Sequence, residues 1–363
     1  MWANKMEEGY RFNDDVLVIK EDRKQAALQY PRVAYALDHP SLREWFVRAD
    51  LLANAAKRRS RISGYLAVTL VAVALFVAAA EPLYGENHGA AQASAVVSAA
   101  LGLAGALIGA FGLLHSGAKR RWLWNRQSTE QMRLFHFRTI LELSDLVCEG
   151  RKEEFLQRRE VRFRTFEEEV LSRPAQAFGD IVDRDWRFEG ITPEVPAVQI
   201  PDGELAGELL AAYRQLRVQR QIDFCEYKLQ KDGRLFSKFP SQQAIRLETA
   251  SAVGLIGTIL THVFIVAAIG TGNPSWIGAW TYVLGMWLAI TALALKTLQE
   301  GLQPNRETER YRHYRATLRA AAERFDTAPS VPAKLQFAAQ VERAAADEMI
   351  IFLRAGVESR FLM

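Results

Sequence analysis

The chain has 363 residues, of which 49% are hydrophobic and 24% are charged, and its formal net charge is +4. Basic residues beside membrane segments account for most of this small charge, so the composition gives no reason to expect a nucleic-acid partner. Cys148 and Cys225 are too few for a disulfide framework or a zinc site, and we expect neither a metal nor a cofactor. The 46 lysines and arginines are absent from two long stretches, 62–118 and 247–295. This distribution is typical of a membrane protein.

Residues 1–61 are polar and charged, and we predict that they form a cytoplasmic N-terminal segment. The first apolar stretch follows them and therefore begins too far along the chain to be a cleaved signal peptide. Residues 62–118 are long enough for two membrane crossings of about 20 residues each. Pro82 and Gly85 predict a turn between the two crossings. This stretch is the first predicted transmembrane hairpin.

Residues 119–246 have the charge and the periodicity of a cytoplasmic helical region. Helix is predicted over most of residues 120–189, with a break at Pro174, and again from Glu204. The segment 190–203 contains three prolines and two glycines, which predict a linker or an extended strap. Nearer the N-terminus, residues 16–19 (Val-Leu-Val-Ile) are the only plausible short strand.

A cluster of arginines within this region could bind an anionic ligand such as a nucleotide. It consists of Arg158, Arg159, Arg162 and Arg164. Glutamates lie among them in the sequence, and such a mixture favours a solvated helix face of mixed charge.

Residues 247–296 are predicted to form the second transmembrane hairpin. Residues 249–295 carry no charge, and the sequence Gly-Thr-Gly-Asn-Pro-Ser at 270–275 interrupts them with turn residues. Residues 297–363 are predicted to be cytoplasmic C-terminal helices, divided by Pro329 and Pro332. Because lysine and arginine flank both hairpins but are missing from the connecting loops, the positive-inside rule predicts that both termini are cytoplasmic. The fold class is an all-α membrane protein with four transmembrane helices, arranged as two hairpins with cytoplasmic helical extensions.

Small residues recur at spacings of three and four along the second transmembrane helix. The predicted helix-packing glycines are Gly102, Gly105, Gly109 and Gly112. Small residues at this spacing share one face and let another helix backbone approach closely. The partner helix is either in the same subunit or in a neighbouring one, and the sequence does not distinguish these two arrangements.

Polar side chains fall near one another on the third transmembrane helix, and they are the predicted pore-lining residues. They are Ser251, Thr258, Thr261 and His262. An imidazole inside a membrane normally faces a partner or water. His262 is therefore the best single functional candidate, and its alternative role is that of a neutral histidine that fixes helix packing.

Sequence motifs for catalysis are missing. There is no Walker phosphate loop, no His-Glu-x-x-His and no nucleophile elbow. We therefore expect that the protein is not an enzyme.

The second half of the chain has a recognisable pattern of residue types. It reads Tyr-Arg-Gln-Leu-Arg-Val-Gln-Arg at 213–220, then the tight hairpin, then Glu-Arg-Tyr-Arg-His-Tyr-Arg at 309–315, and a final helix that contains Asp347 and Glu348. This half resembles the SLATT family, the two-transmembrane effector domains that associate with SMODS nucleotide synthetases and SLOG sensors in bacterial conflict systems. Residues 42–166 look like a more divergent copy of the same plan.

The resemblance implies an effector that assembles in the bacterial inner membrane and opens or disrupts it when an upstream sensor protein or nucleotide second messenger signals infection. We therefore expect a homo-oligomeric, pore-forming or permeabilising antiviral effector whose partner is the lipid bilayer. Two alternatives stay open, namely a constitutive ion channel or transporter and a non-conducting membrane scaffold.

Overall fold

The computed structural model describes residues 13–115, 117–172, 202–230, 239–272 and 277–358. Every regular element within these ranges is a helix, and four of the helices are long and apolar enough to cross a membrane. The predicted fold class, an all-α membrane protein, is confirmed. The predicted break at Pro174 and most of the predicted linker 190–203 lie outside the described ranges.

The chain divides into two compact units, each built from separate stretches of sequence. Residues 55–119 and 231–307 form one unit, which we call the spanning unit. Residues 1–54, 120–230 and 308–357 form the other, which we call the bundle unit.

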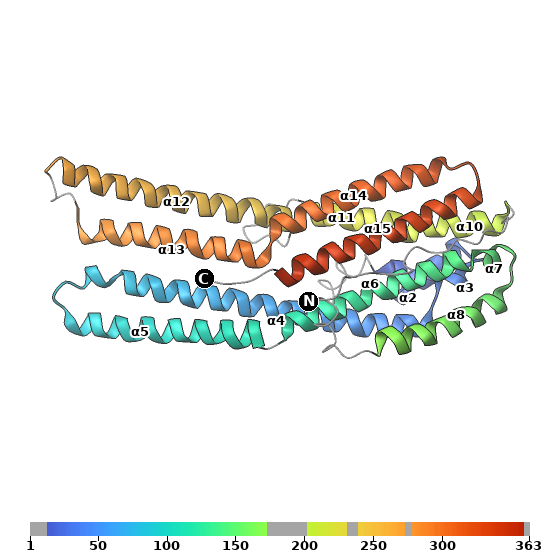
Figure 1. Cartoon of the computed structure of the whole chain (residues 1–363), viewed down its shortest axis with the longest axis horizontal. Helices are drawn as coiled ribbons and strands as arrows, with labels where there is room; N and C mark the ends of the chain where they lie inside the picture. The colour runs from blue at the N-terminus through green and yellow to red at the C-terminus, as the bar shows by residue number, and fades with distance from the viewer. Residues whose placement is uncertain (1–12, 116, 173–201, 231–238, 273–276, 359–363) are drawn as a thin grey trace. The chain divides into compact units, whose positions relative to one another are not determined.

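The spanning unit consists of two helical hairpins (Figure 1). The first pairs α4 (Pro40–Ala79) with α5 (His88–Leu107), which continues as the π-helix η3 (Ile108–His115). The short 3₁₀-helix η2 (Glu81–Leu83) and Gly85, with φ of 55°, make the turn between them, and Asn87 caps α5 by accepting a hydrogen bond from the backbone N–H of Ala90. The second hairpin pairs α12 (Pro240–Gly270) with α13 (Ala279–Leu302).

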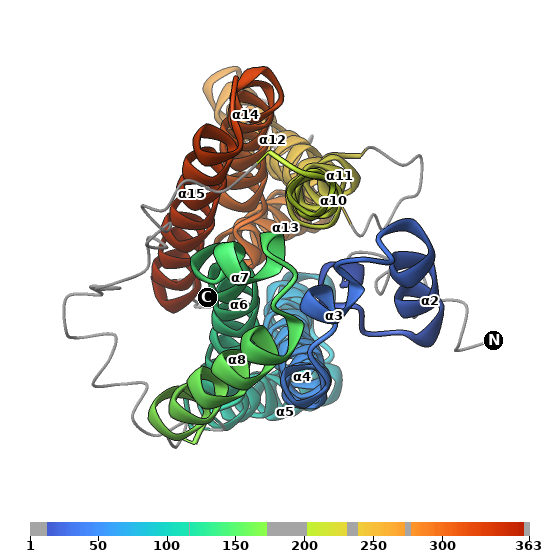
Figure 2. The same cartoon turned by 90° about the vertical axis from the view of Figure 1, so that its right-hand side faces the viewer.

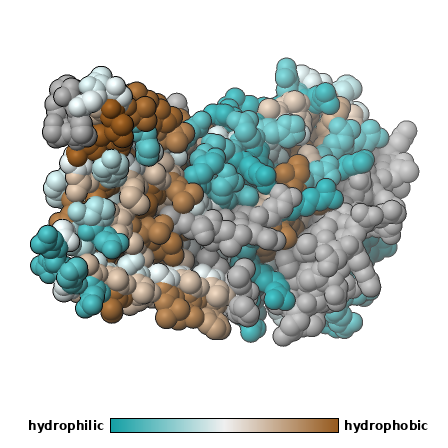
Figure 3. Space-filling view, turned by 60° about the vertical axis from the view of Figure 1, so that its left-hand side comes forward, coloured by the Kyte–Doolittle hydropathy of each residue, from teal (hydrophilic) through white to brown (hydrophobic). Residues whose placement is uncertain are grey.

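The surface of the spanning unit is apolar, as expected of helices that face lipid. Figure 3 shows brown, hydrophobic side chains gathered over this unit and teal, hydrophilic ones over the bundle unit. Along α12 the side chains of Val253, Leu260, Val263 and Val266 are all more than half exposed.

The bundle unit contains most of the remaining helices and the first part of α4. Its elements are η1 (Asp14–Val16), α2 (Lys20–Gln29), α3 (Ala34–Leu37), α6 (Ala118–Glu142), α7 (Ser144–Cys148), α8 (Lys152–Phe166), η4 (Glu167–Leu171), α10 (Glu204–Tyr213), the π-helix η6 (Arg214–Gln219), α11 (Arg220–Leu229), α14 (Pro304–Thr327) and α15 (Val331–Glu358). Helix begins again at Glu204 as predicted.

One local prediction for this unit was wrong, and one reversal of the chain was not predicted. The plausible strand at 16–19 is not formed, because residues 14–16 make a turn of 3₁₀-helix and Leu17 adopts the left-handed conformation with φ of 51°. Helix covers most of residues 120–171, as predicted, but it is interrupted after Glu142 and the chain reverses at Gly150. Gly150 has φ of 73°, a conformation in which glycine ends helices without strain, and the N–H of Arg151 donates to the carbonyl of Leu146 at 2.8 Å.

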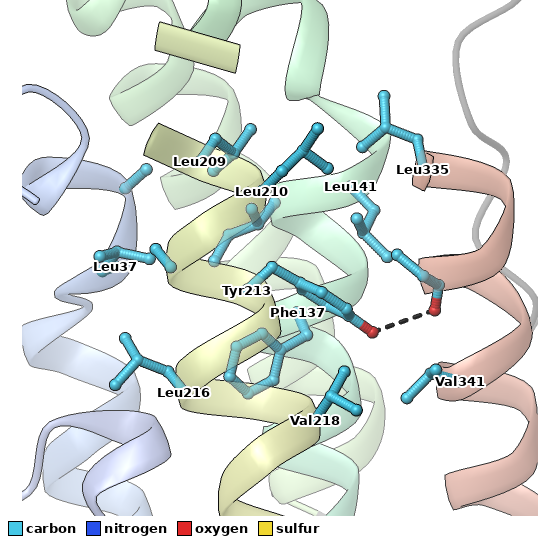
Figure 4. Close-up of a cluster of buried hydrophobic side chains, with 14 of the residues drawn as sticks. Leu37, Phe137, Leu141, Leu209, Leu210, Tyr213, Leu216, Val218, Leu335 and Val341 are labelled. Atoms are coloured by element: carbon cyan, nitrogen blue, oxygen red, sulfur yellow. Dashed lines mark hydrogen bonds between the residues drawn. The ribbon is translucent and has the colours of Figure 1, made fainter. Parts of the chain in front are cut away.

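A large apolar cluster holds the bundle unit together (Figure 4). It joins Phe137 and Leu141 of α6 to Tyr213 of α10 and to Leu335 and Val341 of α15. Figure 2 looks along these helices and shows α6, α10 and α15 arranged around this region. Figure 4 also shows the hydroxyl of Tyr213 pointing at α15, where it donates to the carbonyl of Ala338 at 3.0 Å. Polar contacts are therefore built into the apolar core.

Candidate functional site

The predicted polar residues of the third transmembrane helix all lie on α12, and two of the hydroxyls are satisfied by the helix itself. The hydroxyl of Thr258 donates to the carbonyl of Gly254 at 2.9 Å, and that of Thr261 donates to the carbonyl of Gly257 at 2.8 Å. Bonds of this kind let a threonine sit in lipid without an unpaired donor.

Three of the four residues are close to α13, within the same hairpin, because the Cε1 atom of His262 would also lie 3.6 Å from a Cβ atom built on Gly285. The hydroxyl of Ser251 donates to the carbonyl of Ala292 at 3.2 Å. Thr261 lies opposite Gly285, where a Cβ atom would come 3.2 Å from the threonine methyl group. In this chain, therefore, Ser251 and Thr261 contribute to the packing of α12 on α13.

Thr258 and His262 lie together in an open, shallow groove on α12. Its lining is Thr258, Ile259, His262, Val263, Val266 and Ala267. The hydroxyl hydrogen of Thr258 is already donated within the helix, and the imidazole is the only other polar side-chain group of this lining.

The bonding of His262 defines which of its ring nitrogens is available. Nδ1 lies 2.8 Å from the carbonyl oxygen of Thr258, and the side chain is exposed. A carbonyl only accepts hydrogen bonds, so Nδ1 must carry the hydrogen, and in the neutral ring Nε2 is then an acceptor. No described residue of the chain donates to Nε2. The groove thus presents an unpaired acceptor on a surface that the sequence places in hydrocarbon.

The glycine stripe on α5 faces α4 in the same chain. A Cβ atom built on Gly105 would come 2.8 Å from the Cγ2 atom of Val71 and 3.1 Å from the carbonyl oxygen of Ala67. A Cβ on Gly102 or Gly109 would meet its neighbour on α4 at ordinary contact distances of 3.7 and 3.9 Å. These three glycines therefore pack within the first hairpin, and Gly105 makes the tightest contact. Gly112 lies in η3, and its side-chain surroundings are outside what the structure describes.

Trp287 joins the two hairpins, and the sequence analysis did not identify it. Its indole N–H donates to the carbonyl of Phe76 at 3.0 Å, and its ring packs edge-on against that of Phe76 with centroids 6.0 Å apart. Tryptophan usually lies at the membrane boundary, whereas Trp287 follows the start of α13 by about two turns. The position of a tryptophan so far from the end of the predicted span was the feature of the sequence that could have identified Trp287.

The bundle unit contains a buried ion pair that the sequence analysis also missed. Arg217 is 2% exposed, and its guanidinium donates two parallel hydrogen bonds, of 2.9 and 2.7 Å, to the carboxylate of Glu342. The hydroxyl of Tyr213 shares its one hydrogen between this carboxylate, at 2.7 Å, and the carbonyl of Ala338, at 3.0 Å. Burial alone would lower the pKa of Arg217, but the adjacent carboxylate outweighs it and holds the pKa well above its ordinary value.

Both Tyr213 and Arg217 belong to the 213–220 pattern on which the family resemblance rests. They are four residues apart, which places them on one face of a helix. The spacing was visible in the sequence, but their partner Glu342 is 125 residues further along the chain.

The arginine cluster on α8 is mostly a solvated face of mixed charge, as the sequence favoured. Arg158 pairs with Glu154 at 2.6 Å, and Arg164 pairs with Glu160 at 3.6 Å. Arg159 differs, because it is buried and donates to the backbone carbonyls at residues 35 and 38. It is a structural residue that ties α8 to α3.

Within the described residues no group of three or more histidine, cysteine, aspartate or glutamate side chains could hold a metal ion. The fold and these sites define an all-α, multi-pass membrane protein with a largely apolar groove on one span that contains a histidine. No protein-family model, curated protein or solved structure matches the chain. The functional interpretation therefore depends on the residues and geometry described above.

Proposed function

We propose that this protein is a membrane effector whose copies assemble through the α12 groove and form a pore in, or otherwise permeabilise, the bacterial inner membrane. Both termini would be cytoplasmic, and activation would belong to a signal-dependent anti-phage or conflict system, as the resemblance to the SLATT family implies. The observation that carries the proposal is the unpaired Nε2 of His262 on an otherwise apolar outer face.

A polar group in hydrocarbon is costly unless it finds a partner or water. His262 follows Thr258 by one helical turn and precedes the end of α12 at Gly270 by about 12 Å, at 1.5 Å per residue. It therefore lies well inside the bilayer, beyond the reach of headgroups and bulk water. A second copy against this groove would cover the imidazole or would enclose water beside it, and the enclosed arrangement would be an ion path.

The bundle unit is the part that would receive the signal. It contains the charged helices and the 213–220 pattern, and it would be contacted by an upstream sensor protein or a nucleotide second messenger. The proposal includes no enzymatic activity and no nucleic-acid partner.

The test is ion flux through liposomes that contain the purified protein, measured with and without candidate cyclic nucleotides. Flux that requires an activator supports the effector. Constitutive flux supports the alternative of an ion channel or transporter, and no flux under any condition supports a non-conducting scaffold.

Two variants make the test specific to the groove. His262→Ala should change conductance or its pH dependence, because it removes the one titratable group of the groove. Ser251→Ala is the matched control, since Ser251 also lies on α12 but bonds to α13. If both variants and the unmodified chain give equal currents, His262 does not line an ion path and serves only in helix packing.

A further inference from the structure

A short strap at residues 13–18 crosses the bundle unit ahead of α2. Three consecutive residues of the strap are almost wholly buried, because Asp15 is 1%, Val16 is 3% and Leu17 is 2% exposed. So short a segment is rarely buried so completely unless it joins parts of the structure around it.

The three buried side chains contact different parts of the bundle unit. Val16 belongs to a small apolar cluster with Phe46 of α4 and Phe163 of α8. Leu17 belongs instead to the large cluster around Tyr213. The left-handed conformation of Leu17 accompanies this change of direction, and Arg23 holds the turn by donating to the carbonyls of Leu17 and Val18 at 3.2 and 3.0 Å.

Asp15 adds an electrostatic contact between the same elements. One carboxylate oxygen lies 3.0 Å from Nε of Arg133 on α6 and 3.9 Å from Nη1 of Arg217 on η6. Its other oxygen, Oδ1, has no hydrogen-bond partner among the described residues. The same oxygen that faces the arginines also accepts a hydrogen bond from Gln221 at 3.4 Å, and Arg133 donates a further hydrogen bond to the side-chain oxygen of Asn13 in the strap. The strap therefore contacts two buried arginines, and its carboxylate is only partly satisfied.

Both arginines have another carboxylate. Arg133 also pairs with Glu130 at 2.7 Å, and Arg217 has its two hydrogen bonds to Glu342. If the strap detaches, each guanidinium still has a carboxylate beside it, and the carboxylate of Asp15 becomes hydrated. Detachment of the strap thus avoids the large penalty of an unpaired buried charge.

We propose that residues 13–18 are a latch that opens as a unit before the helices it joins. When closed, it connects the Phe46 and Phe163 cluster to the large cluster. When open, it withdraws Val16 and Leu17 from these clusters and uncovers Arg133 and Arg217. The latch is a property of the bundle unit alone, so its existence does not depend on pore formation by the spanning unit.

Hydrogen exchange of the full-length protein in detergent tests the latch directly. Backbone amides of residues 14–18 should exchange at least roughly tenfold faster than the central amides of α6 and α15, because local opening has a lower free energy than global unfolding. Equal rates in the three segments would overturn the proposal, because the strap would then unfold only with the core.

The variant Asp15→Asn removes the charge and keeps the shape. We expect exchange at 14–18 to accelerate by roughly tenfold or more while α6 and α15 stay protected, since the substitution removes the attraction between the buried carboxylate and the two guanidinium groups. Asp326→Asn is the matched control, because Asp326 also pairs with an arginine, Arg214, but lies outside the strap. Unchanged exchange in Asp15→Asn would contradict the latch. If that variant does not fold, the strap is a core element, and the comparison of rates in the unmodified protein decides independently.

Discussion

Arg217 and Glu342 bear opposite charges in the middle of an apolar cluster, and each depends on the other. A buried ion pair adds little over an apolar pair of the same size, but removal of one partner leaves the other charge without compensation. The geometry at Arg217 includes two parallel hydrogen bonds and a third bond from Tyr213 to the shared carboxylate. At the scale of single residues, this carboxylate is the most sensitive point of the bundle unit.

We predict that Glu342→Gln lowers the free energy of unfolding of the bundle unit by about 3–5 kcal/mol, the usual cost of breaking a buried pair. Denaturant unfolding of the full chain, followed by hydrogen exchange in α10 and α15, measures this change. Glu309→Gln is the control, since Glu309 pairs with Arg312 on the exposed surface and its loss should change stability little. Equal effects of the two substitutions would contradict the importance of burial at Glu342.

Two buried histidines make the bundle unit sensitive to acid. Burial, together with the nearby Arg159, lowers the pKa of His39 to about 2 and that of His136 to about 3. Their rings are 6.5 Å apart, and neither nitrogen of His136 has a hydrogen-bond partner among the described residues. In the unfolded chain each imidazole has its ordinary pKa of about 6.5.

The unfolded state therefore binds protons below about pH 6.5, whereas the folded state does not until about pH 3. We predict that stability is constant above about pH 6.5 and falls on acidification, with a limiting slope of about 1.4 kcal/mol per pH unit for each histidine. Thermal unfolding between pH 7.5 and 5 measures the slope. His136→Phe should flatten it, whereas His313→Gln, on the exposed face of α14, should not.

Helix pairs in the spanning unit are held by close backbone approach. Gly105 on α5 and Gly254 on α12 both allow close packing within their hairpins, because a Cβ atom on either would come within 3.3 Å of a backbone atom of the partner helix. Lipid offers helices little hydrophobic drive to associate, so such contacts supply much of the packing energy. At the scale of elements, the hairpins depend on a few small residues.

We predict that Gly105→Ala destabilises the first hairpin by about 1–3 kcal/mol, as overpacking does. Gly109→Ala should be neutral or slightly stabilising, because there is room for the methyl group and alanine is the better helix former. Resistance to unfolding in a denaturing detergent distinguishes them. If the Gly105→Ala variant is as stable as the unmodified protein, the glycine stripe is not required for the packing of α5 on α4.

Sequence periodicity and charge were sufficient for the spans, because an apolar run of this length without lysine or arginine has one physical solution in a membrane. The reversal at Gly150 was missed because a glycine in a polar, helix-prone stretch is a weak signal. The candidate site was predicted in part. Its residue types were visible, but the difference between Ser251, which bonds to α13, and His262, which borders α13 at Gly285 and is exposed, depends on how α12 is rotated against its partner.

At the scale of the whole molecule, the proposed assembly places copies against the α12 groove. Val266 lines that groove and is 70% exposed, and Leu103 on α5 is similarly exposed at 62% but lies elsewhere. These two positions allow a comparison in which exposure is matched and location differs.

We predict that Val266→Cys forms disulfide-linked dimers on mild oxidation in membranes, whereas Leu103→Cys does not. Both variants carry Cys148→Ser and Cys225→Ala to remove the native thiols, and non-reducing electrophoresis measures the yield. If the Leu103→Cys variant forms dimers and the Val266→Cys variant does not, the copies contact one another through α5 and not through the α12 groove.

The order of synthesis gives the Arg217–Glu342 pair another consequence. Arg217 leaves the ribosome before α12 and α13, and Glu342 follows 125 residues later, after both of these spans. Until then the guanidinium has no such partner, and the core of the bundle unit is incomplete. Completion of this core therefore reports that the second hairpin has already been made, and a nascent chain arrested between the two residues would present an unfinished core to chaperones and proteases.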